Sequence, residues 1–540
     1  MEENRIANVT ETAGKPAVWK SAPFFLKASL LFSAFYVFCL YDNPSGITYP
    51  LFTAGLLGLY VIFLKRENGK LKKSSVFYMT AIFLLGLSNC LTDNGMILWF
   101  NKLGSFLLYG ILFVHNSCED GTWRFLKYTG SLLRFGLSIV ENLPAVFLAG
   151  KDLMAEKRKN SAETGEKKKE SKAVYVILGL LLGLLFLFFI LPLLASADQR
   201  FEQLIDQIFN AVFFQIALPE HLIAVLFMFF WGVLFYFGIL SALRKTKISA
   251  DQKELRKLEP VMAATFLCVI GVVYLIFCLV QISYLFTGGL RLPSGYTYSG
   301  FAREGFFQLL FVSILNLGIV LFVLELFRSS KVLKILLTFL CGCTYIMALS
   351  SACRMYLYIE AYGLTRLRVL VLAALLMIAL MLGGMICCVY RESFPLFRFS
   401  AAVVTSVYVV LSLGHMDAWI AEYNISQKGI DIGYRDTYTL TLSADTAGVL
   451  ERAARGGMDM TVGAEEVLQD YFSRLEDYED QGIRKFNLSR YLGARAAERY
   501  REKADSVDMS EKNSSGDKEP GLYYNVCESA KMLVENKLLL

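Results

Sequence analysis

Three polar segments between long apolar stretches carry the residue types that could do chemistry. Residues 295–305 read GYTYSGFAREG, residues 354–368 read RMYLYIEAYGLTRLR, and residues 415–424 read HMDAWIAEYN. Guanidinium groups beside tyrosines can bind phosphates or carboxylates, and the carboxylates among them could act as general acids or bases. The candidate binding residues are Tyr296, Tyr298, Arg303, Glu304, Arg354, Tyr358, Glu360, Tyr362, Arg366, Arg368, His415, Asp417 and Asn424.

These segments allow two interpretations. In the first, they form an anion-attracting site. Residues 354–368 are basic, although the orientation that the other loop charges predict places them outside, where loops usually avoid positive charge. In the second, the arginines pair with carboxylates of the same protein, such as Glu304 and Asp417, and the tyrosines form an aromatic belt at the membrane interface.

Polar residues inside the apolar stretches form a second group of candidates, because an intramembrane polar group often has a function. These residues are Asn101, Lys102 and Asn316. Lys102 could pair with an anion, or it could extend to the membrane surface from near the end of its stretch. The second interpretation makes Lys102 a boundary residue.

The sequence gives little support for metal or nucleophilic chemistry. Its histidines, His115, His221 and His415, lie far apart, so a metal site or a catalytic triad would have to be assembled from distant segments. The eleven cysteines lie mostly inside apolar stretches and show no paired CxxC pattern, which argues against zinc. Nucleotide-binding, hydrolase and metalloprotease motifs are missing from the sequence. We therefore expect no metal and no cofactor, and enzymatic activity stays an open question.

The elements that must position these residues are membrane-spanning helices. Of the 540 residues 55% are apolar and only 19% are charged, and apolar stretches of span length separate the charged clusters. In lipid such stretches must be helical, because no water is available to satisfy an irregular backbone. The sequence predicts an all-α, polytopic transmembrane helix bundle of about eleven spans. They lie near residues 24–41, 47–64, 75–91, 96–115, 173–194, 221–242, 261–286, 305–327, 333–353, 369–390 and 399–414.

The charges in the loops predict the orientation of the bundle. Short cytoplasmic loops are rich in Lys and Arg. In this chain Lys and Arg gather near residues 65–73, 151–172, 243–259, 328–334 and 391–398. With a cytoplasmic N-terminus, eleven spans place all of these segments in the cytoplasm and the tail after residue 415 outside. The segment 354–368 is then a basic loop on the outer side.

Composition divides the chain into six segments. We expect a cytoplasmic N-terminus (1–22), a first membrane block of about four spans (23–115), a cytoplasmic amphipathic helix with a Lys-rich linker (116–172), a second membrane block of about seven spans (173–414), an extracytoplasmic helical tail (415–504), and a flexible linker with the C-terminus (505–540).

Two of the predicted helices do not span the membrane. Residues 122–142 and 200–217 alternate apolar and polar side chains at helical spacing, which is typical of helices that lie in the membrane surface. The first would lie on the inner surface and the second on the outer surface. Alternatively, both cover the apolar surface of the bundle itself.

Four segments resemble a known family. Together they are similar to a bacterial multi-pass membrane protein family catalogued as domain of unknown function 4173, over roughly residues 170–445. The resemblance implies a protein of the bacterial cytoplasmic membrane, and it implies no activity. The matching residues are LPLL at 191–194 before SAD at 196–198; GYTY at 295–298 with AREGF at 302–306; RM at 354–355 with YGLTRLR at 362–368; and DA at 417–418 with YNI at 423–425.

We expect an integral membrane protein with a role in transport or in the cell envelope. One alternative is a sensor or assembly factor whose outer tail binds a partner protein. Another is an enzyme that acts on a lipid-linked substrate, with Glu304, Glu360 or Asp417 as acid or base. The expected partners are the lipid bilayer, an anionic lipid or small anion, and a protein bound by the tail. Nucleic acid is not expected, because the basic residues lie in short loops between apolar stretches.

Overall fold

The computed structural model describes residues 17–149 except 122 and 148, isolated positions between 183 and 207, and residues 220–245, 258–287, 298–428, 436–456, 464–476 and 482–514. These residues form two compact units. The membrane unit contains residues 1–420 and 481–489, and the tail unit contains residues 421–480 and 490–540.

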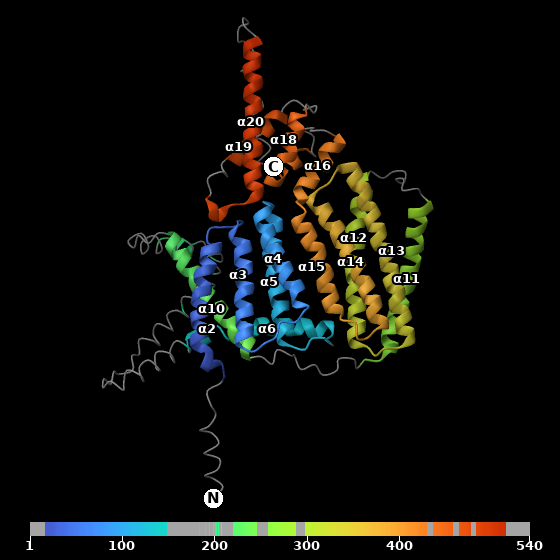
Figure 1. The fold of residues 1–540 in the computed structure, drawn as a ribbon. Helices are drawn as coiled ribbons and strands as arrows, with labels where there is room; N and C mark the ends of the chain where they lie inside the picture. Colours follow the sequence, from blue (N-terminus) through green and yellow to red (C-terminus); the bar gives the residue numbers. More distant parts are fainter. Residues whose placement is uncertain are drawn as a thin grey trace, which may run out of the picture. The chain divides into compact units, whose positions relative to one another are not determined.

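The described part of the membrane unit is built from helices (Figure 1). In chain order these are α2 (Ala17–Leu40), α3 (Thr48–Arg66), α4 (Ser75–Leu91), α5 (Gly95–Ser117), α6 (Phe125–Glu141), α10 (Glu220–Lys245), α11 (Pro260–Thr287), α12 (Tyr298–Leu326), α13 (Lys331–Tyr362), α14 (Arg366–Tyr390), α15 (Leu396–Leu413) and the start of α16 (Met416–Lys428).

Nine helices in the described part of the chain are long and apolar enough to cross a membrane, and α4 is an apolar helix of 17 residues. These ten helices coincide with ten of the eleven predicted stretches. The eleventh, 173–194, lies outside the described residues apart from isolated positions, as does the predicted surface helix 200–217. The predicted all-α polytopic bundle is confirmed.

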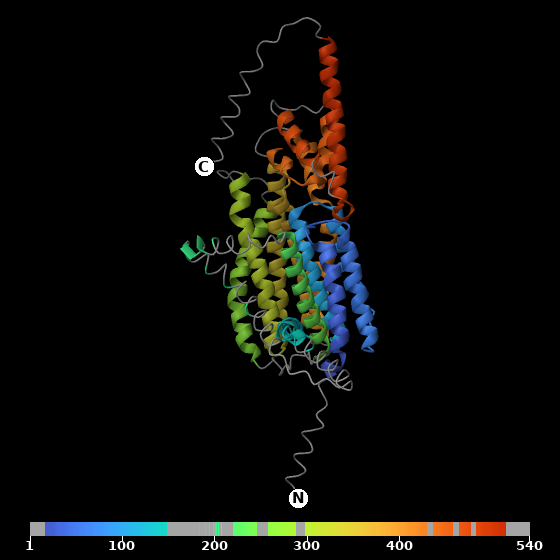
Figure 2. The same ribbon diagram turned by 90° about the vertical axis from the view of Figure 1, so that its left-hand side faces the viewer.

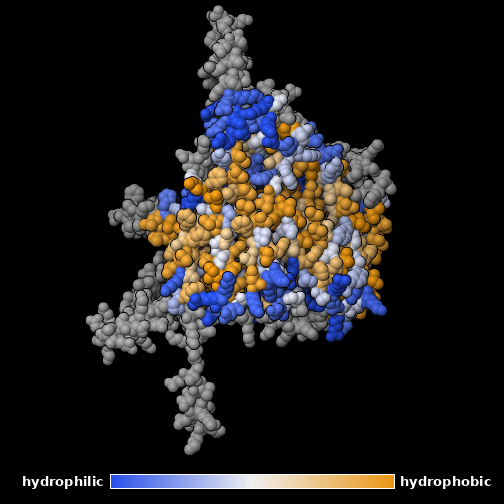
Figure 3. All heavy atoms as spheres, in the orientation of Figure 1, coloured by the Kyte–Doolittle hydropathy of each residue, from blue (hydrophilic) through white to orange (hydrophobic). Residues whose placement is uncertain are grey.

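Large apolar side chains cover the outside of the helices. Figure 3 shows a broad hydrophobic band across them, and α11 exposes apolar side chains such as Val261, Val269 and Val272 along its length. A water-soluble protein rarely exposes a continuous apolar surface of this extent. The hydrocarbon core of a bilayer is the solvent that matches it.

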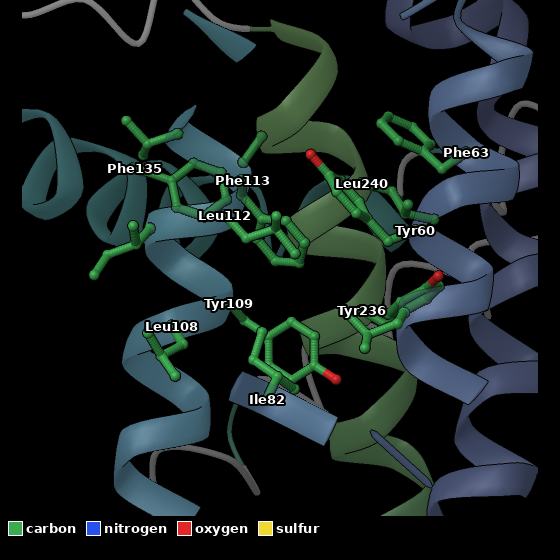
Figure 4. Packing of buried hydrophobic residues seen from close by; sticks show 14 of the residues in the cluster. Tyr60, Phe63, Ile82, Leu108, Tyr109, Leu112, Phe113, Phe135, Tyr236 and Leu240 are labelled. Atoms are coloured by element: carbon green, nitrogen blue, oxygen red, sulfur yellow. The ribbon is translucent and has the colours of Figure 1, made fainter. Parts of the chain in front are cut away.

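The membrane helices form two groups, and each group has its own apolar core. The first group comprises α2 to α6 and α10, whose buried aromatic and aliphatic residues are seen from close by in Figure 4. The second group comprises α11 to α14, with a core that includes Leu317, Leu340 and Leu382. Among the described helices, only α15 packs extensively on both groups, against α14 and against α4, α5 and α6. It contributes Phe397 to the first core and Leu396 to the second.

Contacts between loops define two ends of the membrane unit. At the Asp417 end, the α2–α3 loop, the start of α5, the start of α14 and the start of α16 lie together, because Asp42 contacts Lys485 and Asp417 contacts both Asn94 and Arg366. At the Asp120 end, the α3–α4 loop contacts the segment after α5 through Lys72 and Asp120.

Helix α6 and the start of helix α10 lie at opposite ends of the membrane unit. Helix α6 lies at the Asp120 end, where it begins beside Glu325. Helix α10 begins at the Asp417 end, where His221 Nδ1 lies 2.8 Å from the hydroxyl of Tyr41. It finishes at the Asp120 end, where Arg244 pairs with Glu67.

Helix α6 lies across the bundle helices, along the plane of the view in Figure 1 and nearly end-on in Figure 2. Its buried face carries Tyr128, Ser131 and Phe135, whereas Leu133 and Leu137 are exposed. One face of the helix therefore covers the bundle, and another face is exposed. Trp123, which lies just before the helix, is buried as well.

The tail unit is a small helical assembly. The end of α16, α17 (Asp436–Leu440), α18 (Ala447–Arg455), α19 (Ala464–Glu476) and most of α20 (Leu488–Ser514) belong to it. Phe472 of α19 stacks on Tyr500 of α20 with ring centroids 4.5 Å apart. The buried carboxylate of Glu451 pairs with Arg455 at 2.6 Å.

Candidate functional site

The candidate site is built around a buried carboxylate at the Asp417 end. Asp417 lies in the first turn of α16, and its side chain is fully buried. Arg366 donates to it through two nitrogens, with Nε 2.8 Å from Oδ1 and Nη2 2.6 Å from Oδ2. Asn94 donates to Oδ1 at 2.9 Å. The ion pair joins the start of α14 to the start of α16, and the hydrogen bond from Asn94 joins the same carboxylate to the start of α5.

Local helix chemistry explains why each partner stands where it does. Asn94 caps α5, because its side-chain oxygen accepts hydrogen bonds from the backbone of Met96 and Ile97. Its amide nitrogen is then left to donate to Asp417. Arg366 is the first residue of α14, where a positive charge opposes the helix dipole. The carboxylate of Asp417 compensates this charge and also lies favourably at the start of its own helix.

The turn between α13 and α14 uses three further candidate residues. Gly363 ends α13 with a φ of 73°, a left-handed conformation that glycine adopts without strain. The guanidinium of Arg368 donates to the carbonyls of Tyr362 and Gly363 and lies 4.0 Å from the ring centre of Tyr358. Arg368 therefore satisfies the carbonyl groups at the end of α13, where a cation is favourable.

A buried hydrogen-bond network lies beside the ion pair and includes the candidate Asn101 of α5. Asn101 donates to Ser88 of α4 at 3.0 Å and accepts from Ser412 and Tyr408 of α15 at 2.7 and 2.8 Å. Ser412 also donates to Ser88 at 2.7 Å. Every member of this network has a partner, so it fixes α15 against α4 and α5 without leaving an unsatisfied polar group.

The other two intramembrane candidates have separate environments. Asn316 of α12 donates to Thr344 of α13 at 2.9 Å and accepts from Tyr274 of α11 at 2.9 Å, so it holds three helices of the second group together. Lys102 is exposed on α5, and its ammonium lies 5.3 Å from the ring centre of Tyr49 on α3.

Among the remaining candidates, the structure describes the side chains of Arg354, Glu360, His415 and Asn424. Arg354 lies deeper in α13 and donates to Gln281 of α11 at 3.4 Å, whereas Glu360 is exposed. His415 adopts a φ of 49° in the turn between α15 and α16. Asn424 belongs to the tail unit. Tyr296 lies outside the described residues, and for Tyr298, Arg303 and Glu304 only the backbone is described.

The three arginines of the basic loop contact different kinds of oxygen in this chain. Arg366 contacts the carboxylate of Asp417, whereas Arg354 contacts an amide oxygen and Arg368 contacts backbone carbonyls. The pair of Arg366 and Asp417 differs from the other two because Asp417 also accepts from Asn94, so the carboxylate links the second helix group to the first. An anion that displaced Asp417 from Arg366 would break this connection.

A second polar cluster lies at the Asp120 end, and the sequence did not predict it. Asp120 accepts from His115 Nδ1 at 2.6 Å and from Lys72 at 3.2 Å. The Nε2 atom of His115 lies 2.6 Å from the hydroxyl oxygen of Ser74. Burial alone would raise the pKa of Asp120, but the hydrogen bonds from His115 and Lys72 and the positive charge of Lys72 outweigh burial and hold the pKa below its ordinary value of 3.8.

Sequence reasoning missed the partners in both clusters. Asn94 and Asp417 are 323 residues apart, and no periodic pattern links them. A helix-capping signal did exist at Asn94, which directly precedes the apolar stretch of α5, and Ser74 directly precedes α4. Within the described residues, no group of three or more His, Cys, Asp or Glu side chains is placed to hold a metal ion.

Comparison with curated proteins and with solved structures gave no match. One family does match: its description is "Domain of unknown function (DUF4153)", and it covers residues 79–453, which is more than half of the chain. The prediction of a family of unknown function is confirmed, but its number was wrong, since the matching family is 4153 and not 4173. This chain is an integral membrane protein that belongs to the DUF4153 family.

Proposed function

We propose that this protein is a carrier in the bacterial cytoplasmic membrane, with its N-terminus in the cytoplasm and its tail unit outside. In this proposal the two helix groups move relative to each other about α15. The observation that supports this proposal is that the two groups have separate apolar cores and share α15.

Separate cores favour movement between the groups. Tightly packed interiors resist continuous deformation, so a conformational change in a helical protein usually occurs between packed bodies and not inside one. Carriers work in this way, by rocking one group of helices against the other. Here α15 would act as the axis, because Leu396 and Phe397 anchor it in both cores.

Polar links join the two groups at both ends. At the Asp417 end, Asp417 joins Asn94 of the first group to Arg366 of the second. At the Asp120 end, the backbone N–H of Phe125 donates to Glu325 at 2.9 Å. A carrier must break such links in turn to open each side. The proposed solute is an anion, either small or part of a lipid headgroup, because a carboxylate or phosphate could replace Asp417 at the Arg366 guanidinium.

Accessibility of α15 from both sides would test the proposed movement. Thr405 is buried near the middle of α15, so a Thr405→Cys variant in a cysteine-free background reports on the junction between the groups. A carrier exposes this thiol to a small water-soluble reagent from each side of a sealed vesicle. A rigid bundle exposes it to neither side, and that result would exclude the carrier.

Flux measurements would test the proposed solute class. Vesicles of phosphatidylethanolamine and phosphatidylglycerol containing the protein would be assayed with inorganic phosphate and with a fluorescent phosphatidylglycerol as separate probes. Arg366→Gln should reduce the flux of whichever anion is carried. Glu360→Gln is the matched control, since Glu360 lies on the same loop region and is exposed. Equal flux in both variants would contradict the assignment of Arg366.

A second candidate function is a sensor or assembly factor, and the segment 482–489 favours it. Lys485 pairs with Asp42 at 2.7 Å, and Asn487 donates to the carbonyls of Asn89 and Thr92. These contacts attach this segment of the membrane unit to the loops at the Asp417 end. Truncation after Ser489 keeps the segment and removes the following helix. A sensor should lose a cross-linked partner protein in cells after this truncation, whereas a carrier should keep its flux.

A further inference from the structure

We propose that Ser74, His115 and Asp120 form a serine-nucleophile site at the Asp120 end, and that its substrate is an acyl ester at the membrane surface. This site is independent of the proposed carrier. Ser74 precedes α4, whereas Asn94, which contacts the Asp417 carboxylate, lies at the other end of the α4–α5 hairpin. Its basis is a chain of two short hydrogen bonds from a hydroxyl through an imidazole to a carboxylate.

The geometry has the order that nucleophilic catalysis by serine requires. The hydroxyl oxygen of Ser74 lies 2.6 Å from Nε2 of His115, and Nδ1 of the same ring lies 2.6 Å from Oδ2 of Asp120. A carboxylate can only accept, so Nδ1 carries the hydrogen. The neutral imidazole then accepts the Ser74 proton at Nε2. A hydroxyl, a base and a group that orients the base are thus placed within hydrogen-bond distance of each other.

The conformation of Ser74 is unusual for its position. Ser74 directly precedes α4, where a serine side chain normally accepts a hydrogen bond from the backbone of the first helical turn. Here it makes no such bond, and its hydroxyl is directed to His115 instead. The usual stabilisation of the helix start is therefore replaced by a contact that activates an oxygen.

The surrounding residues hold this arrangement in place. His115 and Asp120 are buried, with 1% and 2% of their side chains exposed, whereas Ser74 is only partly buried. Lys72 donates to the second carboxylate oxygen of Asp120 and, through its backbone N–H, to Asn116 at 3.1 Å. The base and its orienting carboxylate are thus shielded, while the nucleophile can be reached.

The residues beside Ser74 indicate the substrate class. Leu71 and Val76 are 40% and 57% exposed, and Phe77 in the first turn of α4 is 38% exposed. These apolar side chains lie at the end of membrane helices, so they meet the region where acyl chains join lipid headgroups. An ester of a fatty acid would place its acyl chain along them and its carbonyl carbon at the Ser74 hydroxyl.

The proposed reaction has two steps that balance. In the first, the Ser74 oxygen bonds to the ester carbonyl carbon, its proton passes to His115 Nε2, and the ester C–O bond breaks as this proton moves to the leaving alcohol. In the second, water attacks the acyl-serine with His115 as base, and the carboxylic acid leaves as the proton returns to Ser74. Neither step changes an oxidation state.

The test uses a fluorophosphonate probe and a fluorogenic lipid ester. The full-length protein would be reconstituted in vesicles of phosphatidylethanolamine and phosphatidylglycerol. We expect the probe to label Ser74 covalently and the protein to hydrolyse the ester. Ser74→Ala should abolish labelling, and His115→Gln should lower the hydrolysis rate by about a hundredfold or more.

Ser138→Ala is the matched control, since Ser138 is a partly buried serine of α6 at the same end of the bundle. This variant should keep both labelling and hydrolysis. Each variant must show the wild-type chromatographic profile and melting temperature before its activity is compared. A folded wild-type protein that neither reacts with the probe nor hydrolyses the ester would overturn the proposal. Labelling that persists in Ser74→Ala would also overturn it.

Discussion

At the residue scale, the ion pair of Arg366 and Asp417 is asymmetric. Asp417 is completely buried, whereas 29% of the Arg366 side chain is exposed. A buried charge that loses its partner costs about 3–5 kcal/mol, because it keeps the desolvation penalty without the compensating attraction. A partly exposed guanidinium can instead turn to water. The two partners should therefore differ in what their removal costs.

We expect Arg366→Leu to destabilise the protein more than Asp417→Leu. The first variant leaves a buried carboxylate that keeps the hydrogen bond from Asn94 but has lost its guanidinium partner, and should cost about 3–5 kcal/mol. The second leaves an arginine that can reach solvent. Unfolding of both variants by heat or denaturant in detergent would show which of them has the lower free energy of unfolding. The same cost for both, or a larger cost for Asp417→Leu, would mean that the carboxylate does not depend on Arg366.

The sequence predicted part of this site. Arg366 and Asp417 were expected at the same end of the bundle, because both follow apolar stretches whose number and direction the loop charges define. The choice between an anion site and an internal pair stayed open, since residue types alone do not tell whether a guanidinium meets a carboxylate of the chain or of a ligand. Ser74 and Asp120 were not identified, because a side-chain cluster across two loops leaves no periodic signal.

At the element scale, the membrane helices were predictable and their packing was not. Helix α15, expected at 399–414, is found at Leu396–Leu413, since length and apolarity are enough to define a span. Its contacts with both helix groups depend on which faces meet, and an apolar stretch in lipid has no polar face to indicate this. The segment 482–489 was also missed, because its few polar contacts follow no repeat.

Replacing Gly46 should release the segment 482–489 from the α2–α3 loop. A Cβ atom at this position would lie 2.8 Å from the backbone carbonyl oxygen of Arg484, which is too close for any real contact. In Gly46→Ala the backbone of the segment must shift, since a carbonyl cannot rotate away as a flexible side chain can. Hydrogen exchange measured by mass spectrometry should become faster in the peptide that contains Asn487.

Gly58→Ala is the control for this change. Gly58 lies on the neighbouring helix α3, and an added Cβ there meets no atom within 4 Å. It should leave the exchange of the segment as in the wild type. If Gly46→Ala also leaves exchange unchanged, the segment does not lie against this loop in the membrane.

At the scale of the whole molecule, the distribution of Lys and Arg between the two ends predicts which end faces the cytoplasm. Basic residues such as Lys72 and Arg244 lie at the Asp120 end, where they pair with acidic groups. Short loops rich in Lys and Arg prefer the cytoplasm, so the basic residues at this end favour a cytoplasmic Asp120 end.

Single-cysteine labelling would test this orientation. Lys70 lies in the loop before α4 and Glu360 near the end of α13, and both are exposed. With a membrane-impermeant thiol reagent on intact cells, Glu360→Cys should react, and Lys70→Cys should react only after permeabilisation. The opposite pattern would invert the protein and place the Ser74 cluster outside. Equal reaction of both positions in intact cells would contradict the two-ended bundle itself, because Lys70 lies at the Asp120 end and Glu360 near the Asp417 end.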